Sequence, residues 1–182
     1  MKVYRFRVVI EDDNEIFRDI EVTANQTFKD FHIAIQKAFG FDGSQMASFY
    51  LSDKDWNKGE EVTLYNMNEE EDADKEEILV MNQTKLSALI KKVNQKVLYV
   101  FDFLNGWTFY IELIKIASQK VEIDYPVCVK SVGKAPDQYS KNITTKDEED
   151  AILEALKDPY SFDEEDPLDE DITGEYDEYE QY

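Results

Sequence analysis

Cysteine and histidine are almost absent from this 182-residue chain, which has Cys128 and His32 as its single residues of these kinds. One cysteine cannot form an intramolecular disulfide, and this pair cannot supply the four ligands of a multi-cysteine zinc site. The sequence also lacks a Walker loop, a glycine-rich dinucleotide turn and the Gly-x-Ser-x-Gly and His-Glu-x-x-His motifs. We therefore expect no cofactor, no transition metal and, on balance, no catalysis.

Glycine and proline number only 6 and 4 residues, which excludes collagen-like and linker-rich chains. No apolar run approaches the ~20 residues of a membrane span, and the charged start MKVYRFRVVIEDD does not resemble a signal peptide. A reducing cytoplasmic location without membrane contact is the expectation. The 42% hydrophobic and 13% aromatic residues suffice for one ordinary core.

Positive charge is scarce, with 20 Lys and Arg against 41 Asp and Glu and a net charge of −21. This balance argues against direct binding of nucleic acid or of an anionic membrane, and favours a protein partner with a basic surface. Residues 147–182 hold 17 of the acidic residues and a single Lys. We predict an α+β domain over 1–146, and an acidic segment over 147–182 with a short helix at 147–157 and a weakly ordered tail.

Residues 3–10 alternate between apolar and polar side chains and predict a half-buried strand, which 16–22 follows as the return strand of a hairpin. Thr27 and Asp30 form a capping-box pattern that predicts a helix start, and Gly40 is the expected stop. The apolar positions of this helix are Phe28, Phe31, Ile35 and Phe39.

Further strands are predicted at 48–51, 62–65, 78–81, 96–103 and 107–116, with an edge strand at 121–129 and a short helix from Thr84. Asn105-Gly106 is a tight-turn signal, so 96–103 and 107–116 should form a hairpin. The order predicts an α+β fold with a mostly antiparallel sheet packed on one main helix, plus short helices.

Five segments carry a resemblance to a known family: YRFRVVI, FRDIEV, TFKDFHIAIQKAFGF, KVLYVFDFLNGWTFYIEL and YPVCV. Together they resemble the plasmid pRi ORF-three-like proteins over residues 3–140, which leaves the acidic tail outside. The resemblance implies an elaborated ubiquitin-like, β-grasp-like sheet around one helix. It also implies a family found on plasmids, in chromosomes and beside mobile elements, with no securely assigned activity.

Family members often carry histidines that this chain lacks. Their positions are taken here by the stretch 45–48 and by Phe109, and His32 alone remains of the set. The metal or acid–base chemistry that such a set supports is therefore not carried over to this protein.

His32 and Asp102 are the weak catalytic candidates, as a general base and a neighbouring carboxylate. The simpler interpretation of His32 is a half-buried histidine hydrogen-bonded to the sheet. Cys128 is interpreted as a buried structural thiol rather than as a nucleophile.

Partner-binding candidates are Trp56, Asp102, Asn105 and Trp107. Trp56 lies in the polar stretch 53–59, which predicts exposure, and Trp is enriched at interaction hot spots. Asp102, Asn105 and Trp107 surround a tight turn, where core and turn roles are the simpler interpretation.

A weak calcium-loop pattern occurs in the tail, with the required spacing of oxygen ligands and Gly174 at the sixth place. Pro167 precedes it where a helix would have to lead in, and so acidic a run matches such patterns easily. The candidate ligands are Asp169, Asp171, Thr173, Asp177 and Glu180.

The sequence thus favours a non-enzymatic protein-interaction or adaptor domain. One alternative is an anionic mimic of nucleic acid that binds a basic DNA- or RNA-binding protein through residues 147–180. The other is a small hydrolase or metal protein that uses His32. The oligomeric state is not set by the sequence.

Overall fold

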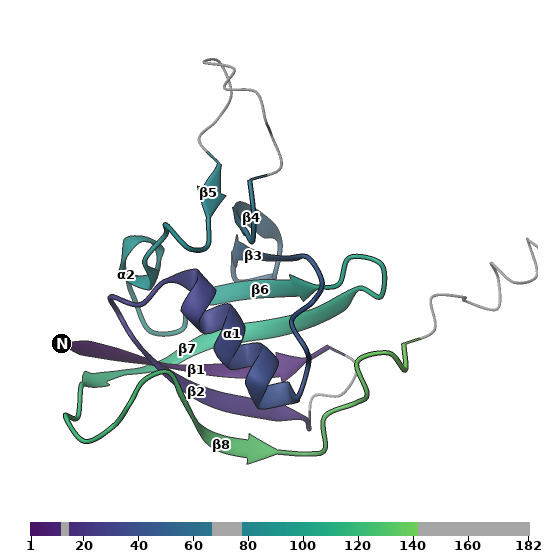
Figure 1. The fold of residues 1–182 in the computed structure, drawn as a ribbon. Helices are drawn as coiled ribbons and strands as arrows, with labels where there is room; N and C mark the ends of the chain where they lie inside the picture. The colour runs from purple at the N-terminus through teal and green to yellow at the C-terminus, as the bar shows by residue number, and fades with distance from the viewer. Residues whose placement is uncertain (12–14, 67–77, 142–182) are drawn as a thin grey trace, which may run out of the picture. The chain divides into compact units, whose positions relative to one another are not determined.

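The computed structural model describes residues 1–11, 15–66 and 78–141 (Figure 1). One compact unit spans Met1–Ile143. Its elements are β1 (Lys2–Ile10), β2 (Phe17–Thr23), α1 (Phe28–Phe39), β3 (Ala47–Ser52), β4 (Lys58–Thr63), β5 (Leu79–Val80), α2 (Leu86–Leu89), β6 (Lys96–Phe101), β7 (Trp107–Ser118) and β8 (Val127–Val132).

The strands form one open sheet in the order β5-β4-β3-β6-β7-β1-β2-β8. Neighbouring strands are antiparallel throughout, except that β4 and β5 are parallel. This confirms the predicted α+β class with a mostly antiparallel sheet and one main helix. The finer description as a β-grasp, like the boundary between the two predicted segments, stays a prediction.

Helix α1 begins and ends where its sequence signals place it. The Thr27 hydroxyl accepts from the Asp30 backbone N–H at 3.2 Å, and the Asp30 carboxylate accepts from the Thr27 N–H at 2.7 Å. Gly40 closes the helix at φ +76°, a conformation that glycine adopts without a Cβ penalty. The predicted capping box and stop are therefore confirmed.

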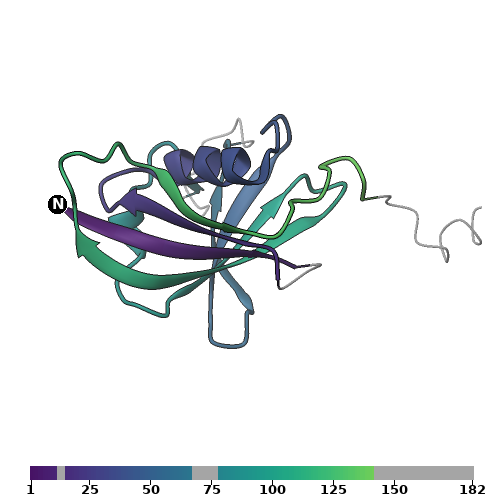
Figure 2. The same ribbon diagram turned by 90° about the horizontal axis from the view of Figure 1, so that it is seen from below.

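The core lies between α1 and one face of the sheet, which Figure 2 shows from below. The Phe31 ring stacks on Phe6 of β1 at 4.6 Å and on Phe49 of β3 at 5.6 Å. All four predicted apolar positions of the helix are buried. We call the opposite side of the sheet the outer face. It carries the alternate side chains of β1, Arg5 and Arg7.

The two predicted hairpins are confirmed by their registers. Phe6 faces Ile20 across β1 and β2, and Tyr99 faces Phe109 across β6 and β7. The strand predicted at 121–129 lies further along the chain, at 127–132. The β3–β4 hairpin extends away from the side of α1 in Figure 2.

Candidate functional site

His32 lies inside the core between α1 and β6, with 2% of its surface exposed. Its Nδ1 lies within hydrogen-bond distance of the Tyr99 hydroxyl, at 2.8 Å. The same hydroxyl accepts from Gln36 Nε2 at 2.6 Å. Burial, together with the positive charge of Lys29, lowers the pKa of His32 to about 4, so the imidazole is neutral at pH 7. The expected hydrogen bond to the sheet is confirmed, and the burial is more complete than the predicted half-burial.

Asp102 belongs to a different cluster, in the β6–β7 turn. Its carboxylate accepts from the backbone N–H groups of Leu104 and Asn105 and from the Asn105 side-chain amide. The structure therefore brings Asp102 and Asn105 together as turn-stabilising residues, and gives His32 and Asp102 separate partners.

Trp107 anchors the chain that follows β8. The buried indole N–H donates to the Gln138 carbonyl at 2.9 Å, and Lys141 Nζ lies 4.9 Å from the ring centre. Gln138 in turn hydrogen-bonds Asp42, and the Tyr139 hydroxyl donates to the same carboxylate. With the Tyr139 bond as the largest cause, these donors hold the pKa of Asp42 well below its usual range.

Trp56 is less exposed than its polar neighbours predicted, because its ring packs on the outer face. The ring meets Tyr110 of β7 edge to face at 4.8 Å, and Lys96 Nζ lies 4.3 Å from its centre. The backbone at Trp56 is left-handed, with φ +66°. The residues around Trp56 in the sequence do not predict this packing, because Tyr110 and Lys96 lie on strands distant in the chain.

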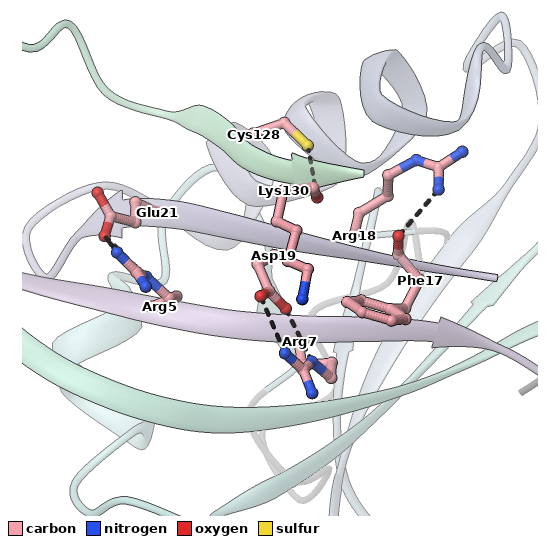
Figure 3. A network of polar contacts seen from close by, with 8 residues as sticks. All are labelled: Arg5, Arg7, Phe17, Arg18, Asp19, Glu21, Cys128 and Lys130. Atoms are coloured by element: carbon pink, nitrogen blue, oxygen red, sulfur yellow. Dashed lines mark hydrogen bonds and ion pairs between the residues drawn. The ribbon is translucent and has the colours of Figure 1, made fainter. Parts of the chain in front are cut away.

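The outer face of β1 and β2 carries two charge pairs that we call the ion-pair ladder (Figure 3). Arg7 binds Asp19 through both carboxylate oxygens, at 2.9 and 3.0 Å. Arg5 binds one oxygen of Glu21 through two nitrogens, at 2.9 and 2.6 Å. Both carboxylates are nearly buried while both guanidinium groups are partly exposed, so the ladder presents positive charge outward. Such multidentate pairs also fix side-chain geometry.

Phe17 continues this surface toward β8. Its ring lies under the Arg7 guanidinium at 4.4 Å and the Lys130 ammonium at 5.1 Å. Because an aromatic face attracts cations, the three side chains order one another (Figure 3). The ion-pair ladder is thus connected to the last strand of the sheet.

Strand β8 pairs with β2 on one side only, and its other edge has no strand beside it within the described residues. Four consecutive residues of the strand are exposed. Cys128 is one of them, so its interpretation as a buried thiol was wrong. The reason is that β8 is the last strand of the sheet, as the sequence predicted, and side chains at a sheet edge are covered less than those of an inner strand.

Arg18 holds β8 in place from the helix side of the sheet. Its guanidinium donates to the carbonyl of Ala38 at the end of α1 and to that of Val132 at the end of β8, at 2.9 and 2.6 Å. Burial lowers the pKa of Arg18, and the Phe39 ring lies 4.8 Å from its charge. The open edge is therefore fixed to the helix by a buried side chain.

The net negative charge lies outside the described residues. These contain 17 Lys and Arg against 15 Asp and Glu, a net of +2, whereas the remaining residues contain 3 against 26, a net of −23. The weak calcium-loop candidate and the predicted helix at 147–157 also lie outside the described residues. Within 1–11, 15–66 and 78–141, no group of three metal-ligating side chains occurs, and no helix has the length and apolar character needed to cross a membrane.

Comparison with known proteins assigns the chain to a family. Residues 2–181 match the family described as "Plasmid pRiA4b ORF-3-like protein". The chain belongs to this family. The match includes the acidic segment, so the narrower extent of 3–140 inferred from the sequence was wrong.

A solved structure shows the same fold. It is the protein of unknown function MM3350 from Methanosarcina mazei Go1, with a TM-score of 0.64 and 25% identity over 87% of this chain and 83% of that one. No curated protein matches the chain. Neither similarity assigns an activity to the chain.

Proposed function

We propose that this chain is a non-enzymatic protein-interaction domain that binds an extended segment of its partner along the open edge of β8. The observation that carries the proposal is that β8 has exposed residues and that its outer edge pairs with no strand within the described residues. A partner strand that adds to such an edge gains main-chain hydrogen bonds, and neighbouring side chains supply specificity.

The surroundings of β8 support this role because they hold the edge in one geometry before binding. Arg18 ties the strand to α1, and the Phe17–Lys130 contact ties it to the ion-pair ladder. A preorganised edge avoids the entropic cost of ordering a loop on binding. Natural edges are often blunted by a bulge and a lysine, and β8 has both, which would restrict pairing to a matching partner.

The charge distribution supports a basic partner. The excess of acidic residues lies in segments 67–77 and 142–182, while the described fold is close to neutral. Acidic segments of this kind accelerate encounter with a basic protein, and their effect weakens as salt rises.

The alternatives gain less from the structure. A hydrolase using His32 would need an accessible base, yet His32 is buried with its Nδ1 engaged. The nucleic-acid mimic depends on residues 147–180, outside the described residues, and so remains a prediction.

The exposed thiol of Cys128 allows a direct test, because a photo-crosslinker attached there samples the β8 edge alone. We expect covalent capture of a partner in cells, and loss of capture in Val129→Pro, which removes a backbone N–H from β8 and disturbs its strand geometry. The matched control is Val121→Pro in the exposed β7–β8 connection, where capture should persist.

Urea unfolding of both proline variants shows whether each remains folded. Capture that survives in a folded Val129→Pro protein would overturn strand addition. Capture that is lost equally in both variants would overturn it as well.

A further inference from the structure

A second surface lies at the other end of the outer face and has no part in the proposed β8 interaction. It is a cleft of about 500 Å³ between the β3–β4 and α2–β6 connections, with one wall from β7. We call it the lysine cleft. Its lining residues are Ser52, Asp53, Lys54, Lys92, Asn94, Gln95, Lys96 and Glu112.

The two carboxylates of the lysine cleft are already engaged by the protein. Asp53 accepts from the backbone N–H groups of Asp55 and Asn57 and from the Asn57 amide. These bonds, with the Asn57 amide first, lower the pKa of Asp53 and keep it a turn-forming acceptor. Glu112 stands between Lys96 of β6 and Arg7 of β1 in the sheet register. With three lysines against two acidic residues, the lining has an excess of one positive charge.

The three ammonium groups differ in how they are held. Lys96 is fixed, because its Nζ donates to the Lys54 carbonyl at 2.7 Å and lies over the Trp56 ring. Lys54 has an exposed ion pair of 3.7 Å with Asp55, which is worth little in water. Lys92 makes no ion pair or side-chain hydrogen bond within the described residues. The cleft thus has two available cations on opposite connections and one fixed cation between them.

The connection that carries Lys92 is itself held in shape. Gln95 accepts from the Lys91 backbone N–H at 2.8 Å and donates to the Leu89 carbonyl at 2.9 Å. The backbone at Asn94 is left-handed, with φ +65°, and its N–H donates to the Leu113 carbonyl of β7. The spacing of the two lysine-bearing connections is therefore set by the fold.

We propose that the lysine cleft binds a phosphorylated small molecule whose anionic group is held between Lys54 and Lys92. Lysine ammonium groups bind phosphate as point charges, and the cleft volume falls within the range of small-molecule sites. The three lysines line one cleft rather than an open strip, which favours a small molecule over a protein surface. The side-chain amide of Asn94 is a neutral polar group at the cleft that could orient the rest of the ligand.

Inorganic pyrophosphate is the probe, titrated into the full chain at low salt and followed by calorimetry and intrinsic fluorescence. Trp56 contacts Lys96 at the cleft, whereas Trp107, the other tryptophan, is buried elsewhere. We expect saturable binding with a fluorescence change that Trp56→Phe abolishes. Lys54→Ala and Lys92→Ala should each weaken binding by about tenfold or more, as loss of a charge-assisted contact does.

The matched control is Lys115→Ala, an exposed lysine on β7 outside the cleft, which should leave the affinity unchanged. Absence of saturable binding, or equal loss in Lys115→Ala, would overturn the site. A Glu-rich decapeptide that binds as tightly as pyrophosphate would overturn the choice of ligand. Val129→Pro should bind pyrophosphate normally, so this test is independent of the β8 proposal.

Discussion

The buried imidazole of His32 should make the protein lose stability in mild acid. The pKa of this group is lowered from 6.5 to about 4 in the folded state, so the unfolded chain binds more protons between these values. The free energy of unfolding therefore rises with pH through this window. The stability that comes from keeping His32 neutral is present above pH 6.5 and is lost below about pH 4. The difference of about 2.5 pKa units corresponds to about 3 kcal/mol.

His32→Asn isolates this contribution from the many carboxylates that titrate in the same range. The asparagine carbonyl can accept from the Tyr99 hydroxyl in place of Nδ1, but it does not titrate. The variant should be less stable than the wild type at pH 7.5, because the smaller side chain leaves a gap. Urea unfolding at successive pH values should show that the wild type loses about 3 kcal/mol more than the variant between pH 7.5 and pH 4.

A second measurement reads the titration directly. His32 is the only histidine, so its Hε1 proton gives an assigned NMR signal without further labelling. We expect this signal to keep its neutral-form chemical shift from pH 7.5 to about 5.5, below the ordinary histidine pKa. A midpoint near 6.5, or a free-energy difference between the two proteins that does not change with pH, would refute the assignment of a desolvated neutral imidazole.

Two further predictions test the packing by urea unfolding. Phe31→Ala should cost about 3–5 kcal/mol, because the ring is buried against Phe6 and Phe49, while Ile33→Ala on the exposed side of α1 should cost under about 0.5 kcal/mol. Similar costs at both positions would mean that the helix packs through a different face. Gly133→Ala should destabilise the protein by about 1–3 kcal/mol, and by more than Gly40→Ala. Both positions have positive φ, but the added Cβ would lie 2.8 Å from Ile16 at Gly133 and would meet nothing at Gly40. Equal costs would show that the contact with Ile16 relaxes.

Local sequence determined the elements whose signals lie within a few residues of one another. The Thr27–Asp30 capping box, the glycine stop and the three-four spacing of apolar residues predicted α1. Alternation predicted the first strand, and the Asn105-Gly106 turn signal predicted the second hairpin. These signals succeed because helix ends and strand faces are set by neighbouring backbone and side-chain geometry.

The candidate sites were decided by tertiary structure. The sequence predicted an edge strand before residue 130, but the exposure of a side chain depends on which elements cover that part of the sheet, so the stretch VCVKSV could not show that Cys128 is exposed. Trp56 contacts Tyr110 and Lys96, and Lys54 and Lys92 line one cleft, only because strands distant in the chain become neighbours. The acidic excess needs no fold to be located, because the sequence alone places most of it in segments 67–77 and 142–182.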